Sequence, residues 1–250
     1  METASGAVRS WRSFYLWWAL SLTAVTFWGF SYTYFGPIAA GQYPQVAPAV
    51  HVHGWSFFLW FLLLPVQTGL IATRKLRVHQ SVGMASLGLA GLMIFTGLLV
   101  LSVRLEAAFA GEAAQAFWLM FGPGVLASLV LFAVFYGAAL LNRRRPGLHR
   151  RLMVVASSAA LGAASFRVFT ELLGRELWVF SLGIAATNAF ILAAMLYDWI
   201  AHRTIHRVYV LGFIVCTGAD VLAVPFARTG AGQATNQGLA SLAGVVGFLY

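Results

Sequence analysis

The sequence predicts an all-α polytopic membrane protein, a transmembrane helical bundle with seven spans and a cytoplasmic N-terminus. Of its 250 residues, 60% are hydrophobic and only 9% are charged, whereas soluble domains carry roughly 25% charged residues. The mean hydropathy is +0.81. Apolar runs long enough to cross the ~30 Å hydrocarbon layer recur along the whole chain, so residues 1–250 form a single transmembrane domain.

Seven segments have the length and polarity of membrane spans, which need about 20 mostly apolar residues each. The first, about 14–36, follows Arg9 and Arg12. It is long and aromatic with no small-residue cleavage site behind it, so we interpret it as a retained span and not as a signal peptide. The other spans are predicted at about 51–73, 81–103, 114–141, 152–173, 178–201 and 208–227.

The loops between these spans alternate in charge. One set contains Arg9 and Arg12 and then the stretches "TRKLRVHQ", "NRRRPGLHRR" and "HRTIHR", while the other set is poor in arginine and holds most of the glutamates. The positive-inside rule places the basic set in the cytoplasm. The net charge of +9 is then explained by topology, with the lipid bilayer as partner and no nucleic acid. We expect a bacterial cytoplasmic (inner) membrane protein, and the sequence leaves a homo-oligomer or a membrane complex open.

The C-terminal tail, residues 236–250, is apolar but short. At 1.5 Å per residue a helix of this length reaches only about 22 Å. An interfacial helix or a half-span is therefore favoured over an eighth membrane segment.

Three basic loops end in a similar tripeptide, an aliphatic residue, a histidine and then glutamine or arginine, which we call the histidine step. The three copies are Val78-His79-Gln80, Leu148-His149-Arg150 and Ile205-His206-Arg207. Together with "FFLWFLLLPVQTGLIATRKLRVHQSVG" and "RRRPGLHRRLMVVAS", the step resembles uncharacterised bacterial multipass membrane proteins with repeated hairpins of helix, basic loop and helix. The resemblance covers about residues 51–155, and the first loop has V-H-Q where the pattern has L-H-R. It implies a fold and no established activity.

The inner histidines, His79, His149, His202 and His206, lie beside arginines at the predicted cytoplasmic boundary. Such residues bind lipid headgroups or satisfy loop carbonyls. Alternatively they form a metal or haem site on the cytoplasmic face, since His202 and His206 have the i,i+4 spacing of two ligands on one helix. The neighbouring arginines would repel a cation there.

The outer half of the bundle carries further ionisable residues. His51 and His53 open the second span, Arg167 and Glu171 lie in the fifth, and Asp220 lies in the seventh. Measured along each helix from the predicted cytoplasmic boundary, Arg167 lies at a height of about 22 Å, Glu171 at about 28 Å and Asp220 at about 18 Å. Charged side chains in hydrocarbon cost about 2.5–3.5 kcal/mol or more. We therefore expect them to face inward, with Arg167 paired to Glu171 at i,i+4 and also to Asp220.

Two interpretations of this group remain open. It is either an ion-pair network that fixes helix packing or an outward-opening pocket. In the second case His51, His53, Glu171 and Asp220 would suit a transition metal. The i,i+2 spacing of the two histidines turns their side chains about 200° apart, so only one of them should face inward. Gln67 and Asn188 lie mid-span and would line the pocket or join helices.

The stretch "FGPGV", residues 121–125, interrupts the fourth predicted span. Pro123 removes a backbone donor and the flanking glycines add freedom. The stretch predicts either a packed kink or a gap that exposes carbonyls beside a cavity, as in transporters.

Several function classes are disfavoured by missing residues. The only lysine, Lys75, lies in a loop, so a retinal Schiff base has no partner. No span carries a mid-depth histidine for bis-histidine haem, which leaves an interfacial haem only. No P-loop, GxSxG or HExxH motif occurs, so the sequence assigns no enzyme class.

Three functions remain. The first is a binding or redox module that holds a metal, a haem-like group or a small ligand in the outer pocket. The second is a proton-coupled or small-solute transporter that uses Arg167, Glu171 and Asp220. The third is a structural or assembly subunit without chemistry.

Overall fold

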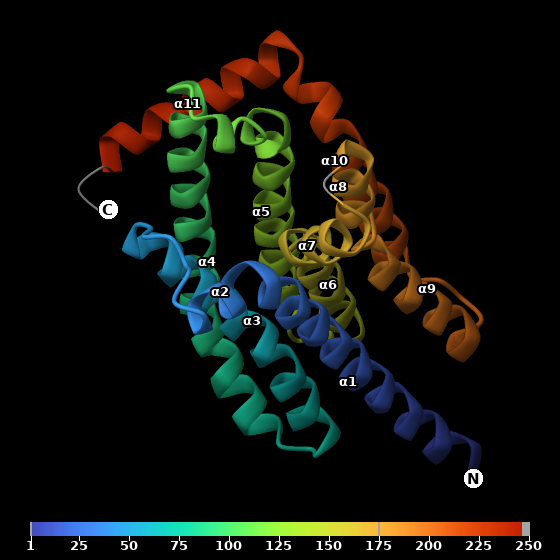
Figure 1. Cartoon of the computed structure of the whole chain (residues 1–250). Helices are drawn as coiled ribbons and strands as arrows, with labels where there is room; N and C mark the ends of the chain where they lie inside the picture. The colour runs from blue at the N-terminus through green and yellow to red at the C-terminus, as the bar shows by residue number, and fades with distance from the viewer. Residues whose placement is uncertain (1, 175, 247–250) are drawn as a thin grey trace.

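The computed structural model describes residues 2–174 and 176–246, and helices account for nearly all of them, with no β-strand in those ranges (Figure 1). The predicted all-α class is confirmed. The elements are α1 (Glu2–Phe30), η1 (Ser31–Phe35), α2 (Gly36–Ala39), α3 (Pro48–Ala72), α4 (Leu76–Phe109), η2 (Ala113–Gln115), α5 (Trp118–Leu141), α6 (Pro146–Ala159), α7 (Gly162–Leu173), α8 (Leu177–Ala185), α9 (Asn188–His202), α10 (Arg207–Ala227) and α11 (Gly230–Val246).

Five helical stretches are long and apolar enough to cross a membrane: α3, α4, α5, Ser181–His202 and α10. A sixth is obtained if α6 and α7 are counted together as one bent span. The apolar helices thus support a membrane protein. The count of seven spans and the cytoplasmic N-terminus remain predictions.

An aromatic cluster forms the centre of the core. Trp60 of α3 is almost fully buried, and its ring meets those of Phe132 and Tyr136 of α5 edge-on, at centroid distances of 4.8 and 5.1 Å. Edge-to-face pairs at such distances add stabilisation beyond the buried area. They link α3 to α5 through side-chain contacts.

The histidine step of the three basic loops has two different roles. His79 and His149 bond back to the helix that precedes their own. In the amide orientation that satisfies both of its polar atoms, Gln67 of α3 donates to His79 Nδ1 at 2.7 Å, and His149 Nδ1 donates to the Ala139 carbonyl of α5 at 2.8 Å. His206 instead caps its own helix and accepts from the Val208 N–H at 3.2 Å.

The predicted span 152–173 is bent by 46° where α6 meets α7. The bend brings α7 close against two other helices. A side chain at Gly29 of α1 would collide with the Ala164 carbonyl, and one at Gly183 of α8 would collide with Phe166. Glycine is thus needed at both positions because the backbones approach closely.

Helix α5 continues without interruption through "FGPGV", so the predicted gap is not present. Pro123 cannot donate to the Leu119 carbonyl four residues earlier. Asn236 of α11 supplies that hydrogen bond instead, from Nδ2 at 2.8 Å. A Cβ at Gly122 would lie 2.9 Å from Asn236 Oδ1, and one at Gly124 would lie 2.9 Å from Ala223 Cβ. The two glycines therefore serve close packing.

Helix α11 crosses the end of the bundle over α4 and α5 (Figure 1). Its buried positions include Gly232, Asn236 and Ala243, which lie about one or two turns apart and so form one inward stripe. The helix begins at Gly230, before the predicted tail, and the place of the tail relative to the membrane stays a prediction. Residues 247–250 lie outside the described part of the chain.

Candidate functional site

His51 and His53 anchor to different neighbours, as their spacing predicts. His51 Nδ1 lies 2.8 Å from the hydroxyl of buried Tyr34. His53 Nδ1 lies 3.2 Å from the hydroxyl of Thr96 in α4. Gly97 makes room for this ring, because a Cβ there would lie 3.0 Å from His53 Cε1. The His53 ring therefore faces α4, and the His51 ring packs among tyrosines.

Arg167 of α7 is held by uncharged groups. Its Nε donates to Thr33 Oγ1 at 2.9 Å, and one terminal nitrogen donates to the Ala163 carbonyl. The guanidinium carbon also lies 4.3 Å from the ring centroid of Phe30, a cation–π distance.

The expected ion pairs of Arg167 with Glu171 and with Asp220 do not form among the described residues. Glu171 is exposed. The Arg167 guanidinium is turned toward η1 by its bonds and by the aromatic face of Phe30, so this part of the sequence interpretation is wrong.

Asp220 has an amide partner. Asn188, the first residue of α9 and 4% exposed, donates from Nδ2 to Asp220 Oδ2 at 2.8 Å. Gln67 contacts His79 and the Gly83 N–H of α4. Of the uncharged pocket candidates, Asn188 thus joins α9 to α10, and Gln67 joins α3 to the first turns of α4, away from His53.

The predicted metal set of His51, His53, Glu171 and Asp220 is not supported. Among the described residues no group of three or more His, Cys, Asp or Glu side chains is placed to hold a metal ion. The same finding covers the inner histidines. His202 ends α9 and His206 caps α10, with Arg203 in the left-handed conformation between them, so the i,i+4 geometry of a continuous helix does not apply.

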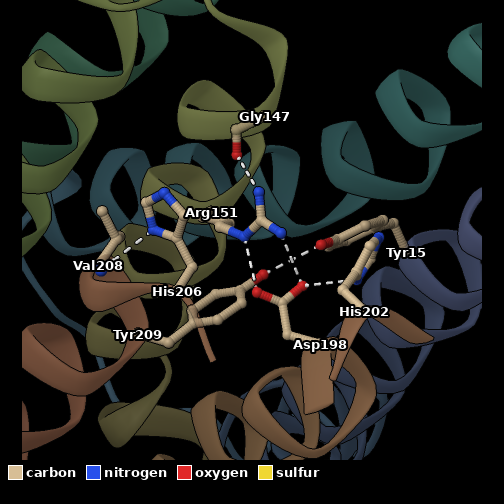
Figure 2. Close-up of polar contacts among 8 residues, drawn as sticks. All are labelled: Tyr15, Gly147, Arg151, Asp198, His202, His206, Val208 and Tyr209. Atoms are coloured by element: carbon tan, nitrogen blue, oxygen red, sulfur yellow. Dashed lines mark hydrogen bonds and ion pairs between the residues drawn. The ribbon is translucent and has the colours of Figure 1, made fainter. Parts of the chain in front are cut away.

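A buried ion pair that the sequence reasoning missed joins α6 to α9 (Figure 2). Arg151 binds Asp198 with two parallel hydrogen bonds, Nε to Oδ2 and Nη2 to Oδ1, each 2.8 Å long. The third guanidinium nitrogen, Nη1, donates to the Gly147 carbonyl at 2.8 Å. Asp198 is 1% exposed. The signal in the sequence is Asp198, a lone aspartate inside an apolar helix. Arg151 counted there only as one of the charges of a basic loop.

Aromatic and imidazole groups surround this ion pair (Figure 2). The hydroxyls of Tyr15 and Tyr209 lie 3.1 Å apart, and His202 Nδ1 lies 3.6 Å from Asp198 Oδ1. Burial and then the nearby Arg151 charge lower the pKa of His206, which favours the neutral ring that accepts from Val208. Because Arg151 and Asp198 neutralise each other fully, the cluster is suited to joining helices.

A cavity of about 140 Å³ lies between the start of α3 and the C-terminal half of α4. Arg104 of α4 lines it together with Gln45 and mainly apolar residues. Nearby Tyr43 is within electrostatic range of both Arg104 and Arg167. Burial raises the pKa of Tyr43, while the two arginine charges oppose that rise. Within the described chain neither arginine has a carboxylate partner.

Comparison with known proteins yields no relative, since no protein-family model, no curated protein and no solved structure matches the chain.

Proposed function

We propose that this protein binds a small anionic molecule at its outer end, near Tyr43, Arg104 and Arg167. The observation that carries the proposal is the arginine pair. Two arginines on different helices lie within electrostatic range of one tyrosine, and neither is ion-paired to a carboxylate in the described chain. A bound anion would balance them.

The chemistry of these side chains supports an anion as the ligand. Arginine offers a planar fork of donors that matches carboxylate and phosphate groups. Arg167 donates from Nε to Thr33 and from one terminal nitrogen to Ala163. Its second terminal nitrogen can donate to a ligand. His51 engages Nδ1 with the Tyr34 hydroxyl, which leaves its Nε2 as a further polar contact.

The cavity supports a ligand of few atoms. Its volume of about 140 Å³ is below the roughly 300–1,000 Å³ of pockets for drug-sized ligands. A simple carboxylate or inorganic phosphate fits this scale better than a haem-like group. In a seven-span inner-membrane protein with a cytoplasmic N-terminus, the site would open to the periplasmic side.

A transporter built on one network of Arg167, Glu171 and Asp220 has less support. Arg167 binds Thr33, and Asp220 binds Asn188. A purely structural subunit gives no role to two arginines that have no carboxylate partner in the described chain.

The proposal is tested by thermal unfolding of the protein in lipid nanodiscs with added acetate or inorganic phosphate against chloride at equal ionic strength. A ligand that binds only the folded state raises its stability by mass action. We expect stabilisation by acetate or phosphate that is lost in Arg167→Gln and in Arg104→Gln. Arg143→Gln, which changes an exposed residue of the α5–α6 loop, should keep it.

Two results would overturn the proposal. One is the absence of stabilisation by either probe. The other is equal stabilisation in the wild type and in both outer variants, which would make the effect a general salt response.

A further inference from the structure

The aspartates of α9 and α10, buried Asp198 and partly exposed Asp220, have opposite surroundings. Asp198 is matched by the Arg151 guanidinium through two hydrogen bonds. Asp220 has only the side-chain amide of Asn188, at 2.8 Å from one carboxyl oxygen. A carboxylate beside arginine is stabilised as an anion, and an amide provides no compensating charge.

No charge compensates Asp220 from the neighbouring helices either. Helix α10 packs against α5, α6, α8, α9 and α11. Among the described residues of these helices, no charged side chain lies in electrostatic range of the Asp220 carboxyl. The Cys216 thiol, one turn earlier on α10, lies within electrostatic range of Asp220.

An uncompensated carboxylate in the membrane is costly, and a bound proton removes the cost. A charged side chain near the bilayer centre costs about 2.5–3.5 kcal/mol on insertion scales. A carboxyl group can avoid that cost by carrying a proton, which also turns an acceptor-only group into a donor. Thr217, three residues earlier on the same helix face, has a buried hydroxyl without a hydrogen-bond partner.

Asn188 is a suitable partner for a carboxyl group that gains and loses a proton. An asparagine amide can donate to a carboxylate or, after turning over, accept from a carboxylic acid. Asn188 is 4% exposed and lies at the start of α9, so it can satisfy Asp220 in both states. The Arg151 guanidinium has donors only and satisfies Asp198 as the anion alone.

We infer that Asp220 is a proton-binding group within the membrane, with Asn188 as the side chain that positions it. The ligand is a proton, exchanged at one carboxyl oxygen of α10. This site shares no residue with the anion site formed by Arg104 and Arg167, and it stands or falls independently of that site.

Infrared spectroscopy of the full-length protein in nanodiscs tests the inference through the carbonyl stretch of protonated carboxyl groups. At about pH 5.5 an aspartate in water, with its pKa of about 3.9, has already lost its proton. We expect a protonated-carboxyl band at this pH that disappears in Asp220→Asn, changes frequency in Asn188→Leu and fades as the pH is raised.

The controls separate this group from the other acids. Glu171→Gln, at an exposed position, should leave the band unchanged, and so should Asp198→Asn where that variant folds. Asp220→Asn keeps a side chain that bonds to Asn188, and its fold is checked by circular dichroism. A spectrum without the band, or a band unaffected by Asp220→Asn, overturns the inference, since Asp220 would then be ionised. If Asp220→Asn loses the band but is still stabilised by acetate or phosphate, the two sites are separate.

Discussion

Two arginines adopt a backbone conformation that glycine usually provides. Arg74 and Arg203, which follow the ends of α3 and α9, have φ values of 61° and 56°. The left-handed region costs a residue with a side chain roughly 1–2 kcal/mol. Both lie in the basic loops, which the positive-inside rule predicts to be cytoplasmic.

The Arg151–Asp198 pair gives a prediction at the same scale. Asp198→Asn should lower the free energy of unfolding by about 3–5 kcal/mol, because it leaves a buried guanidinium uncompensated. Arg151→Met combined with Asp198→Leu should recover most of that loss, since apolar replacement of a buried pair is often neutral. Denaturant titration in mixed micelles measures both, and a double variant as unstable as Asp198→Asn would contradict the prediction.

At the scale of the element, α5 shows how a helix keeps a proline. Pro123 frees the Leu119 carbonyl, Gly122 gives space, and Asn236 of α11 donates the missing hydrogen bond. From composition alone the same residues predict a break, because proline and glycine both disfavour helices. A side chain 117 positions away along the chain decides that the helix continues.

The proline and the asparagine should therefore be energetically coupled. Asn236→Ala should cost about 1–3 kcal/mol, the penalty for a buried acceptor left without a partner. In a Pro123→Ala background the residue-123 N–H can serve the Leu119 carbonyl, so the cost of Asn236→Ala should fall well below that value. A double-mutant cycle on unfolding free energies measures the coupling.

The exposed Gln237, next to Asn236 on α11, provides the control. Gln237→Ala should have the same small effect in both backgrounds. Additive costs for Pro123→Ala and Asn236→Ala would show that the bond to Leu119 contributes nothing to stability.

At the scale of the whole molecule, the alternation of basic and arginine-poor loops predicts the topology. In a Cys216→Ser background, which removes the single buried cysteine, we introduce Arg144→Cys in the α5–α6 loop or Glu112→Cys in the α4–α5 loop. A membrane-impermeant maleimide added to intact cells should label only the second variant, because the positive-inside rule puts basic loops in the cytoplasm. Labelling of Arg144→Cys alone would reverse the orientation.

Local properties of the sequence were sufficient for the all-α class and for the divergence of His51 and His53, and they indicated a membrane protein. Apolar length, loop charge and residue spacing act within one helix or loop, so they can be read without a fold. The tail was predicted from its length alone, and in the structure its described part belongs to α11, which lies across α4 and α5.

The partner of each polar side chain was decided only by the tertiary structure. Arg167 and Asp220 have similar estimated depths, but depth along a helix says nothing about the direction in which its faces turn. Arg167 binds Thr33, 134 positions away, and Arg151 binds Asp198, 47 positions away. Such contacts depend on how helices rotate and cross, which is set by glycine approaches such as Gly29 on Ala164 and by the packing of the aromatic core. For that reason the expected ion-pair network is replaced by a bidentate pair at one end of the bundle, uncompensated arginines at the other, and an aspartate between α9 and α10 with only an amide beside it.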